Sequence, residues 1–238
     1  MILENILFPL LFTAVIACGS PQSNTAVNQQ SFQRRPLTYL ALGDSYTIGE
    51  GVSEEERYPN QLVKRLISET DRAWSNPEII AKTGWTVDEL EEGIKKATPK
   101  GDPYNIVSIL IGVNNQYRGR PVEDFKREFE QLLLKGIGYA GNRPNHVFVL
   151  SIPDWGVTPF ASEKEADKAK VKTEIDAYNE VKKEVCKKYG VIFIEITEDY
   201  REIGAKPEMV VEDKLHPSGL VYARWTDKLF EEVIKIYN

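Results

Sequence analysis

Cysteine and histidine are both scarce in this chain, which has two of each among its 238 residues. Two cysteines, Cys18 and Cys186, cannot build the multi-disulfide scaffold of a small secreted protein. The histidines and cysteines also lack the close spacing of a zinc site. We therefore expect a chain of this length to be held by one hydrophobic core, without a metal.

Basic charge is in short supply as well. Lysine and arginine number 30 against 36 aspartates and glutamates, which gives a net charge of -6. Non-specific binding to phosphate backbones needs a basic face. The composition therefore excludes a general nucleic-acid partner, and we expect none.

No apolar run is long enough to cross a bilayer as a helix, which takes roughly 20 residues. The most apolar stretch, residues 6–17, ends in Val15-Ile16-Ala17 directly before Cys18. An apolar segment that closes on a small residue is typical of a signal peptide, and the cysteine after it resembles a bacterial lipobox. The segment departs from that pattern in having Glu4 and no Lys or Arg before the apolar stretch.

We predict a lipoprotein-type signal peptide over residues 1–17, followed by a lipid anchor on Cys18. A plain signal peptide and an uncleaved apolar segment are the alternatives. Residues 18–35, rich in Ser, Asn, Gln and Thr, are typical of a flexible tether. The protein would then be exported and anchored to a bacterial membrane, facing the periplasm or the cell surface. With Cys18 acylated, Cys186 has no partner for a disulfide, and its helical, apolar neighbourhood predicts a buried thiol.

From residue 36 onward, short apolar runs alternate with stretches of helical periodicity. Strands are predicted at residues 37–42, 78–81, 106–111, 146–151 and 191–194. Helices are predicted at residues 58–67, 86–97, 125–137, 163–189 and 220–237. Strictly alternating strands and helices indicate an α/β fold with a parallel sheet covered on both faces. We therefore predict one domain over residues 36–238, a flavodoxin-like three-layer α/β/α sandwich with five parallel strands, and we expect a monomer.

In such a sheet, ligands bind beyond the carboxyl ends of the strands. The loop after the first strand reads Gly43-Asp44-Ser45 and presents a serine hydroxyl at that edge. It has neither the lysine of a phosphate-binding loop nor the glycine spacing of a dinucleotide site. By itself the serine could be an ordinary turn residue, because serine is common in turns.

A serine nucleophile needs a base. Of the two histidines, His146 opens a predicted strand at its amino end and is expected to be structural or exposed to solvent. His216 lies in a polar loop before the last helix, and Asp213 three residues earlier can accept a hydrogen bond from its second ring nitrogen. Such a bond fixes the tautomer and stabilises the imidazolium. The alternative is that Asp213 only caps a helix and His216 lies on the surface.

An acyl-transfer site also needs hydrogen-bond donors for the oxyanion. Asn114 follows the third predicted strand, and Gly84 follows the second, where a glycine can bring a backbone N–H close to a ligand. Taken singly, Asn114 could be a plain loop residue and Gly84 a plain turn. Together with Ser45 and His216 they supply a nucleophile, a base and an oxyanion hole.

These four blocks, in this order and spread over nearly all of the folded chain, resemble the SGNH (GDSL-like) hydrolase family. The resemblance implies a Ser45–His216–Asp213 triad, with an oxyanion hole made by the Ser45 and Gly84 amides and the Asn114 side chain. It implies a serine hydrolase that cleaves carboxylic esters through an acyl-enzyme, without a metal or cofactor.

The chain departs from the family at one position of the third block. That block commonly reads Gly-x-Asn-Asp, whereas Asn115 stands here in place of the acid. We expect Asn115 to support its loop, so that the change affects local hydrogen bonds rather than the reaction. Asp44, beside Ser45, is expected to orient the turn, and its use as the triad acid is an alternative.

The resemblance leaves the substrate open, because the family includes lipases, lysophospholipases, thioesterases and carbohydrate deacetylases. Trp155 and Phe160 could line an acyl pocket, and Arg118 or Arg120 could meet an anionic head group. These residues could equally serve packing alone. The sequence shows no long apolar lid segment, which favours a short-chain ester or an acetylated glycan over a long-chain lipid. The rival hypothesis is an inactive surface lipoprotein that binds a ligand without turning it over.

Overall fold

The computed structural model describes residues 35–99 and 103–237. The predicted signal peptide, Cys18 and most of the predicted tether lie outside the described residues, so these features stay predictions. Within the described ranges, no helix is both long and apolar enough to cross a membrane.

Five strands form one sheet in which every neighbouring pair is parallel. They are β1 (Tyr39–Gly43), β2 (Glu78–Ala81), β3 (Ile106–Leu110), β4 (Val147–Leu150) and β5 (Ile192–Ile194), in the spatial order β2-β1-β3-β4-β5. β1, β3 and β4 are buried along their whole length. A strand buried on both faces reads as a continuous apolar run, and this is why the sequence located these strands.

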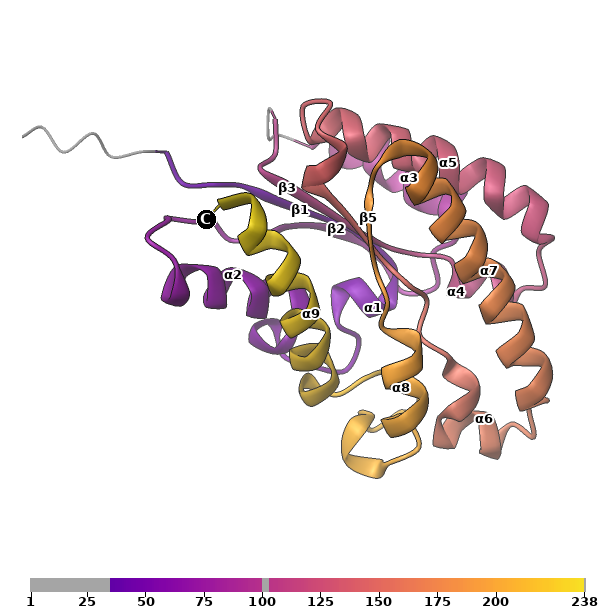
Figure 1. Cartoon of the computed structure of the whole chain (residues 1–238). Helices are drawn as coiled ribbons and strands as arrows, with labels where there is room; N and C mark the ends of the chain where they lie inside the picture. Colours follow the sequence, from indigo (N-terminus) through magenta and orange to yellow (C-terminus); the bar gives the residue numbers. More distant parts are fainter. Residues whose placement is uncertain (1–34, 100–102, 238) are drawn as a thin grey trace, which may run out of the picture. The chain divides into compact units, whose positions relative to one another are not determined.

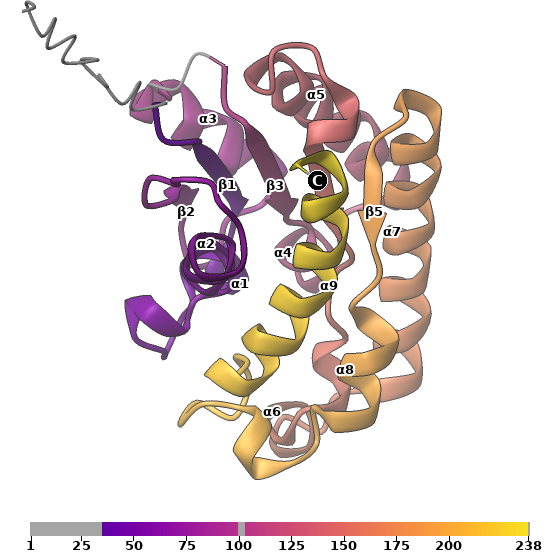
Figure 2. The same ribbon diagram turned by 60° about the vertical axis from the view of Figure 1, so that its left-hand side comes forward.

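Helices cover both faces of the sheet, as predicted (Figure 1). The α-helices are α1 (Ser45–Ile48), α2 (Tyr58–Glu69), α3 (Val87–Ala97), α4 (Val113–Tyr117), α5 (Val122–Tyr139), α6 (Pro159–Glu163), α7 (Lys168–Tyr189), α8 (Thr197–Ile203) and α9 (Gly219–Tyr237). Single 3-10 turns lie at Glu54–Glu56, Pro144–His146, Trp155–Val157 and Pro207–Met209. α2 and α9 pack together on one face, whereas α3, α5 and α7 cover the other (Figures 1 and 2). This is the three-layer α/β/α arrangement of the flavodoxin-like type.

The predicted single helix over residues 163–189 is wrong, because the chain breaks between α6 and α7. Glu165 lies in the left-handed region with a φ of 52°, which ends the first helix. Asp167 then caps the second, accepting a hydrogen bond from the Lys170 amide at 3.0 Å. Such a carboxylate satisfies an N–H that has no partner in the first turn of a helix. Helices α1, α4 and α8 were not predicted, because they are too short to show helical periodicity.

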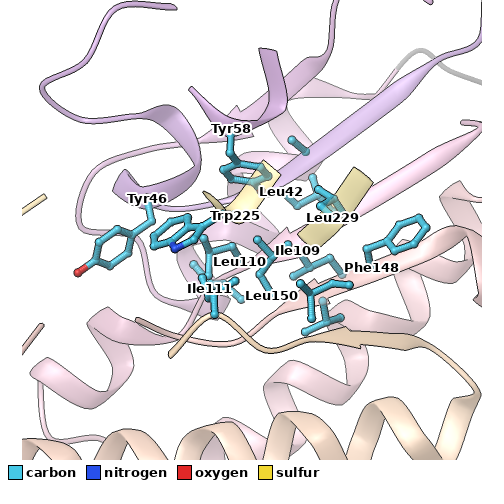
Figure 3. Packing of buried hydrophobic residues seen from close by; sticks show 14 of the residues in the cluster. Leu42, Tyr46, Tyr58, Ile109, Leu110, Ile111, Phe148, Leu150, Trp225 and Leu229 are labelled. Carbon is cyan, nitrogen blue, oxygen red and sulfur yellow. The ribbon is translucent and has the colours of Figure 1, made fainter. Parts of the chain in front are cut away.

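The main core lies between the sheet and the helices of each face. On the face covered by α9, Trp225 and Leu229 pack near Leu42 and Ile109 of the central strands (Figure 3). Trp225 and Leu229 are completely buried. Burial of a large apolar side chain contributes roughly 1.5–3 kcal/mol, so this layer fixes α9 against the strands.

The strand order creates a switch point between β1 and β3. From β1 the chain crosses to β2 on one side, and β3 lies on the other side. The connections diverge there and leave a crevice at the carboxyl ends of the strands. Ser45 follows β1 and Asn114 follows β3, so both lie at this point of the fold.

Candidate active site

A cavity of about 220 Å³ opens at the carboxyl ends of the central strands. The residues that line it are Ser45, Tyr46, Thr83, Gly84, Val113, Asn114, Tyr117, Trp155, Phe160, Leu215 and His216. The structure therefore brings together residues from loops that are up to 171 positions apart, from Ser45 to His216. Ser45, Gly84, Asn114 and His216, singled out from the sequence, share one cavity.

Ser45 is the first residue of α1, directly after the tight turn that follows β1. A Cβ atom at Gly43 would lie 2.3 Å from the Leu110 carbonyl oxygen, so only glycine allows this close approach. Asp44 then caps α1, its Oδ1 accepting from the Tyr46 amide at 3.0 Å. Burial raises the pKa of the Asp44 carboxyl to about 7. Asp44 orients the turn, as expected, while the histidine contacts a different carboxylate.

That carboxylate belongs to Asp213. Its Oδ2 lies 2.5 Å from Nδ1 of His216, and its Oδ1 accepts from the backbone amides of Leu215 and His216 at 2.8 and 2.9 Å. Partial burial raises the pKa of Asp213, but these hydrogen bonds outweigh it and lower the pKa below its ordinary value. An ionised Asp213 holds the proton on Nδ1, which leaves Nε2 of His216 as the basic nitrogen.

The imidazole also packs on an aromatic ring that the sequence analysis did not single out. Tyr46 lies with its ring centroid 5.6 Å from that of His216 and 6.2 Å from that of Trp225. Figure 3 shows Tyr46 beside Trp225 at the edge of the core. The position of Tyr46 directly after Ser45 was the available signal. The ring restricts the position of the imidazole by contact.

The cavity lining also includes the two candidate oxyanion donors, Asn114 and Gly84. Asn114 donates one Nδ2 hydrogen bond to the Trp85 carbonyl at 3.0 Å, and an amide nitrogen has a second N–H. Gly84 adopts a φ of 83°, a conformation that favours glycine. Both residues line the cavity with Ser45.

Asn115 is completely buried and supports the same region, as expected. Its Oδ1 accepts from the Val87 amide at 3.1 Å, at the start of α3. Its Nδ2 donates to Oε2 of Glu128 at 3.3 Å. An aspartate could accept the first bond but could not donate the second, so the neighbouring Glu128 favours the amide found in this chain.

Aromatic side chains form one side of the cavity. Trp155 meets Tyr117 edge-on at 5.3 Å between ring centroids and meets Phe160 at 6.3 Å. Trp155 is anchored by Nε1, which donates to Oε1 of Gln116 at 2.9 Å. Gln116 in turn donates to Glu174 at 2.7 Å. This chain of hydrogen bonds holds the indole in place at the wall of the cavity.

The two arginines expected near the cleft are both ion-paired. Arg118 bonds Glu89 at 3.1 Å, and Arg120 bonds Asp88 at 2.6 Å. Neither lines the cavity. The structure thus gives both guanidinium groups a role within the protein.

The remaining histidine and cysteine lie away from the cavity lining. His146 is at the amino end of β4, where its Nδ1 lies 2.7 Å from the Asn105 carbonyl oxygen. Burial lowers its pKa. Cys186 is buried, as predicted, and burial raises the pKa of its thiol to about 12. A thiol in that state is unreactive near neutral pH.

A buried lysine lies behind the site and was missed in the sequence. Lys182 on α7 is fully buried, and its Nζ donates to the carbonyl oxygens of Ile111 at 3.0 Å and Leu150 at 2.7 Å. Burial lowers its pKa to about 7. These carbonyls lie just beyond β3 and at the end of β4, so the amine links the strands where they diverge. Helical periodicity was the available signal, because Lys182 shares the buried stripe of α7 with Tyr178 and Val185. The residue type pointed the other way, since a lysine on a helix is normally solvated.

Among the described residues, no group of three or more His, Cys, Asp or Glu side chains could hold a metal ion. The cavity instead combines a hydroxyl, a carboxylate-bound imidazole and an amide donor. Such a set can carry out nucleophilic acyl transfer with its own side chains.

Comparisons with known proteins give the family and the fold. The family model described as GDSL-like Lipase/Acylhydrolase matches residues 41–224. A search of curated proteins finds no match. Among solved structures, TesA has 18% sequence identity and a TM-score of 0.64 over 84% of this chain and 99% of its own.

Two further solved structures have the same fold. The lipase/acylhydrolase from Enterococcus faecalis is 17% identical, with a TM-score of 0.62 over 84% of this chain and 96% of its own. An Axe2 mutant, an acetyl-xylooligosaccharide esterase from Geobacillus, is 16% identical, with a TM-score of 0.61 over 83% and 94%.

Proposed function

The chain belongs to the GDSL-like lipase/acylhydrolase family, and from this premise we propose that it hydrolyses carboxylic esters through an acyl-enzyme on Ser45. Hydrolysis of ester bonds is the activity of the family. The acyl-enzyme, the residue roles and the substrate below are our proposal. The observation that carries it is the bond between Asp213 and His216 at a cavity that Ser45 also lines.

In the first half of the reaction, Ser45 Oγ attacks the ester carbonyl carbon while Nε2 of His216 takes the hydroxyl proton. The carbonyl electron pair moves to oxygen, and the oxyanion is held by the Ser45 and Gly84 amides and the Asn114 side chain. When the intermediate collapses, the C–O bond to the alcohol breaks. His216 gives its proton to the departing alkoxide, which leaves as the alcohol.

In the second half, a water molecule attacks the acyl carbon and His216 removes its proton. The second oxyanion uses the same donors. Its collapse breaks the bond to Ser45 Oγ, which regains the proton from His216, and the carboxylic acid leaves. Asp213 stays ionised throughout and stabilises the imidazolium in both halves.

The cavity supports a short acyl group as the substrate. Its volume of about 220 Å³ is below the ~300–1,000 Å³ of pockets for drug-sized ligands. The indole of Trp155, held by its hydrogen bond to Gln116, occupies one side of the cavity. One structure with this fold is an acetyl-xylooligosaccharide esterase, which favours acetylated glycans as a candidate class. Hydrolysis of small acyl esters, acetate above all, is therefore our specific proposal.

We also propose that the enzyme works as a monomer at the end of a lipid anchor on Cys18, exported to a bacterial membrane. The support is the sequence alone, namely the apolar segment over residues 6–17 and the polar stretch after it. Mass analysis of the mature N-terminus tests this. An acylated Cys18 is the expected result, and an intact Met1 would exclude the lipoprotein.

The catalytic proposal is tested with p-nitrophenyl esters from acetate to palmitate, using the protein without residues 1–18. We expect highest activity on the shortest esters, and loss of activity in Ser45→Ala and His216→Ala. Asp213→Asn should lower kcat by up to ~10⁴-fold, because the imidazole loses its orienting carboxylate. An organophosphonate should label the parent protein but not Ser45→Ala. An inactive parent that is also not labelled would support a ligand-binding protein instead.

A further inference from the structure

Three side chains, on α4 and at its C-terminal end, form hydrogen bonds with the backbone of the segment that begins at Gly84. Asn114 donates to the Trp85 carbonyl at 3.0 Å, and Asn115 accepts from the Val87 amide at 3.1 Å. Arg118 completes the set, with Nη2 donating to the Gly84 carbonyl at 2.6 Å. Side chains of α4 and of the residue that follows it thus hold three consecutive peptide groups of the neighbouring chain.

Arg118 also ties this loop to the start of α3. Its Nη1 donates to Oε1 of Glu89 at 3.1 Å. The other oxygen of Glu89 accepts from the Thr86 amide at 2.9 Å, which closes a capping box at the first turn of α3. One guanidinium therefore bridges a backbone carbonyl and a carboxylate that are five residues apart.

We propose that Arg118 is a positioning residue of the oxyanion hole, fixing the Gly84 backbone at a set distance from Asn114. The inference rests on the proposed function, in which the Gly84 amide and the Asn114 side chain hold the same oxyanion. The Gly84 amide follows β2, whereas Asn114 follows β3. Arg118 is four residues after Asn114, at the C-terminal end of α4. Arg118 holds Gly84 through its carbonyl, so the amide on the other side of the residue stays available to the substrate.

Two features separate this role from simple stabilisation. The Arg118 side chain is 43% exposed, and an ion pair at such a site contributes little to folding. Gly84 has a φ of 83° and space around its Cα, where the nearest atom to an added Cβ is Nη2 of Arg118 at 3.9 Å. Packing around the Gly84 Cα therefore does little to hold it, whereas Arg118 bonds the Gly84 carbonyl directly. A lysine could not fully replace Arg118, because the Gly84 carbonyl and the Glu89 carboxylate bond two different nitrogens of the planar guanidinium.

The experiment compares Arg118→Ala and Arg118→Lys with Arg120→Ala as the matched control. Arg120 is also ion-paired to the first turn of α3, but its guanidinium bonds Asp88 rather than the loop that carries Gly84. We measure kcat and KM on p-nitrophenyl acetate and on p-nitrophenyl hemisuccinate, whose free carboxylate carries a negative charge. Thermal unfolding and the rate of organophosphonate labelling are measured on the same proteins.

For Arg118→Ala we expect a 10- to 100-fold lower kcat on both esters, because misplacing a reacting group by ~1 Å costs on this order. We expect KM to stay within about threefold, labelling to slow in parallel, and unfolding to match the Arg120→Ala control within a few degrees. Arg118→Lys should recover part of the rate. Added guanidine at low millimolar concentration should restore some activity to Arg118→Ala alone.

Three results would overturn the proposal. The first is an unchanged kcat in Arg118→Ala. The second is a defect confined to KM for the charged ester, which would make Arg118 a substrate contact. The third is a loss of activity that follows a loss of folded protein. A failure of the proposed function is distinct, because the parent protein would then neither hydrolyse the esters nor be labelled at Ser45.

Discussion

Replacing Asn115 with the aspartate of the family pattern tests whether Glu128 requires an uncharged hydrogen-bond donor at position 115, next to the proposed oxyanion hole. Asn115 is completely buried and donates to Oε2 of Glu128 at 3.3 Å. Burial raises the pKa of Glu128 above its ordinary value, and the nearby Asp88 adds to the effect. Asn115→Asp would place a second carboxylate against this one and remove the hydrogen-bond donor between them.

The expected cost follows from the distance. Two unit charges 3.3 Å apart repel by ~5 kcal/mol at an effective dielectric constant of ~20. The Glu128 side chain is 34% exposed, so solvent screening reduces this value. The new carboxylate would also accept more strongly from the Val87 amide. We therefore expect Asn115→Asp to lower the free energy of unfolding by about 2 kcal/mol at pH 7.

The cost should depend on pH with a definite sign. Repulsion raises the carboxyl pKa values in the folded state, so the native protein binds more protons than the unfolded chain. Stability is then lost as the pH rises through the raised pKa values and is recovered below them. Relative to the parent at the same pH, we expect a deficit under ~0.5 kcal/mol at pH 4.5.

Urea unfolding at pH 4.5 and pH 7 measures both values. The matched control is the double variant Asn115→Asp with Glu128→Gln, in which an amide again faces a carboxylate with the roles exchanged. It should recover most of the stability at pH 7. Equal destabilisation at the two pH values, or no recovery in the double variant, would refute the electrostatic reasoning and point to a packing defect.

Two more predictions concern the wall and the back of the site. Trp155→Leu should enlarge the cavity and raise activity on the hexanoate ester relative to the acetate ester by about tenfold. Trp155→Phe, which keeps a ring but loses the bond to Gln116, should change this preference less. An unchanged chain-length profile in both variants would show that the acyl group binds elsewhere. Burial lowers the pKa of Lys182 to about 7, so this amine loses its proton at a lower pH in the native protein than in the unfolded chain. The free energy of unfolding therefore increases as the pH rises above 7. Urea unfolding at pH 7 and 9 should therefore show the parent gaining about 2 kcal/mol relative to Lys182→Met, and a constant difference would contradict the lowered pKa.

The sequence by itself determined the layers of the fold and part of the cavity lining, including Ser45, Gly84, Asn114 and His216. Continuous apolar runs indicated the buried strands, because a strand covered on both faces has no polar side. Loops that follow parallel strands must meet at one edge of the sheet, so Ser45, Gly84 and Asn114 could be grouped from their order in the chain alone. The three-residue spacing of Asp213 and His216 was enough to suggest their bond, which is local.

Only the tertiary structure decided the contacts between segments that are far apart in the chain. Tyr46 meets His216 across 170 positions, and Arg118 reaches Gly84 across 34. Lys182 falls on the buried stripe of its own helix, but the sequence could not show its partners, because these are carbonyls at the ends of two strands. Sequence periodicity reports which face of an element is apolar, whereas a bond between distant elements depends on how they pack. That packing turned a set of suitable residues into a site with one geometry.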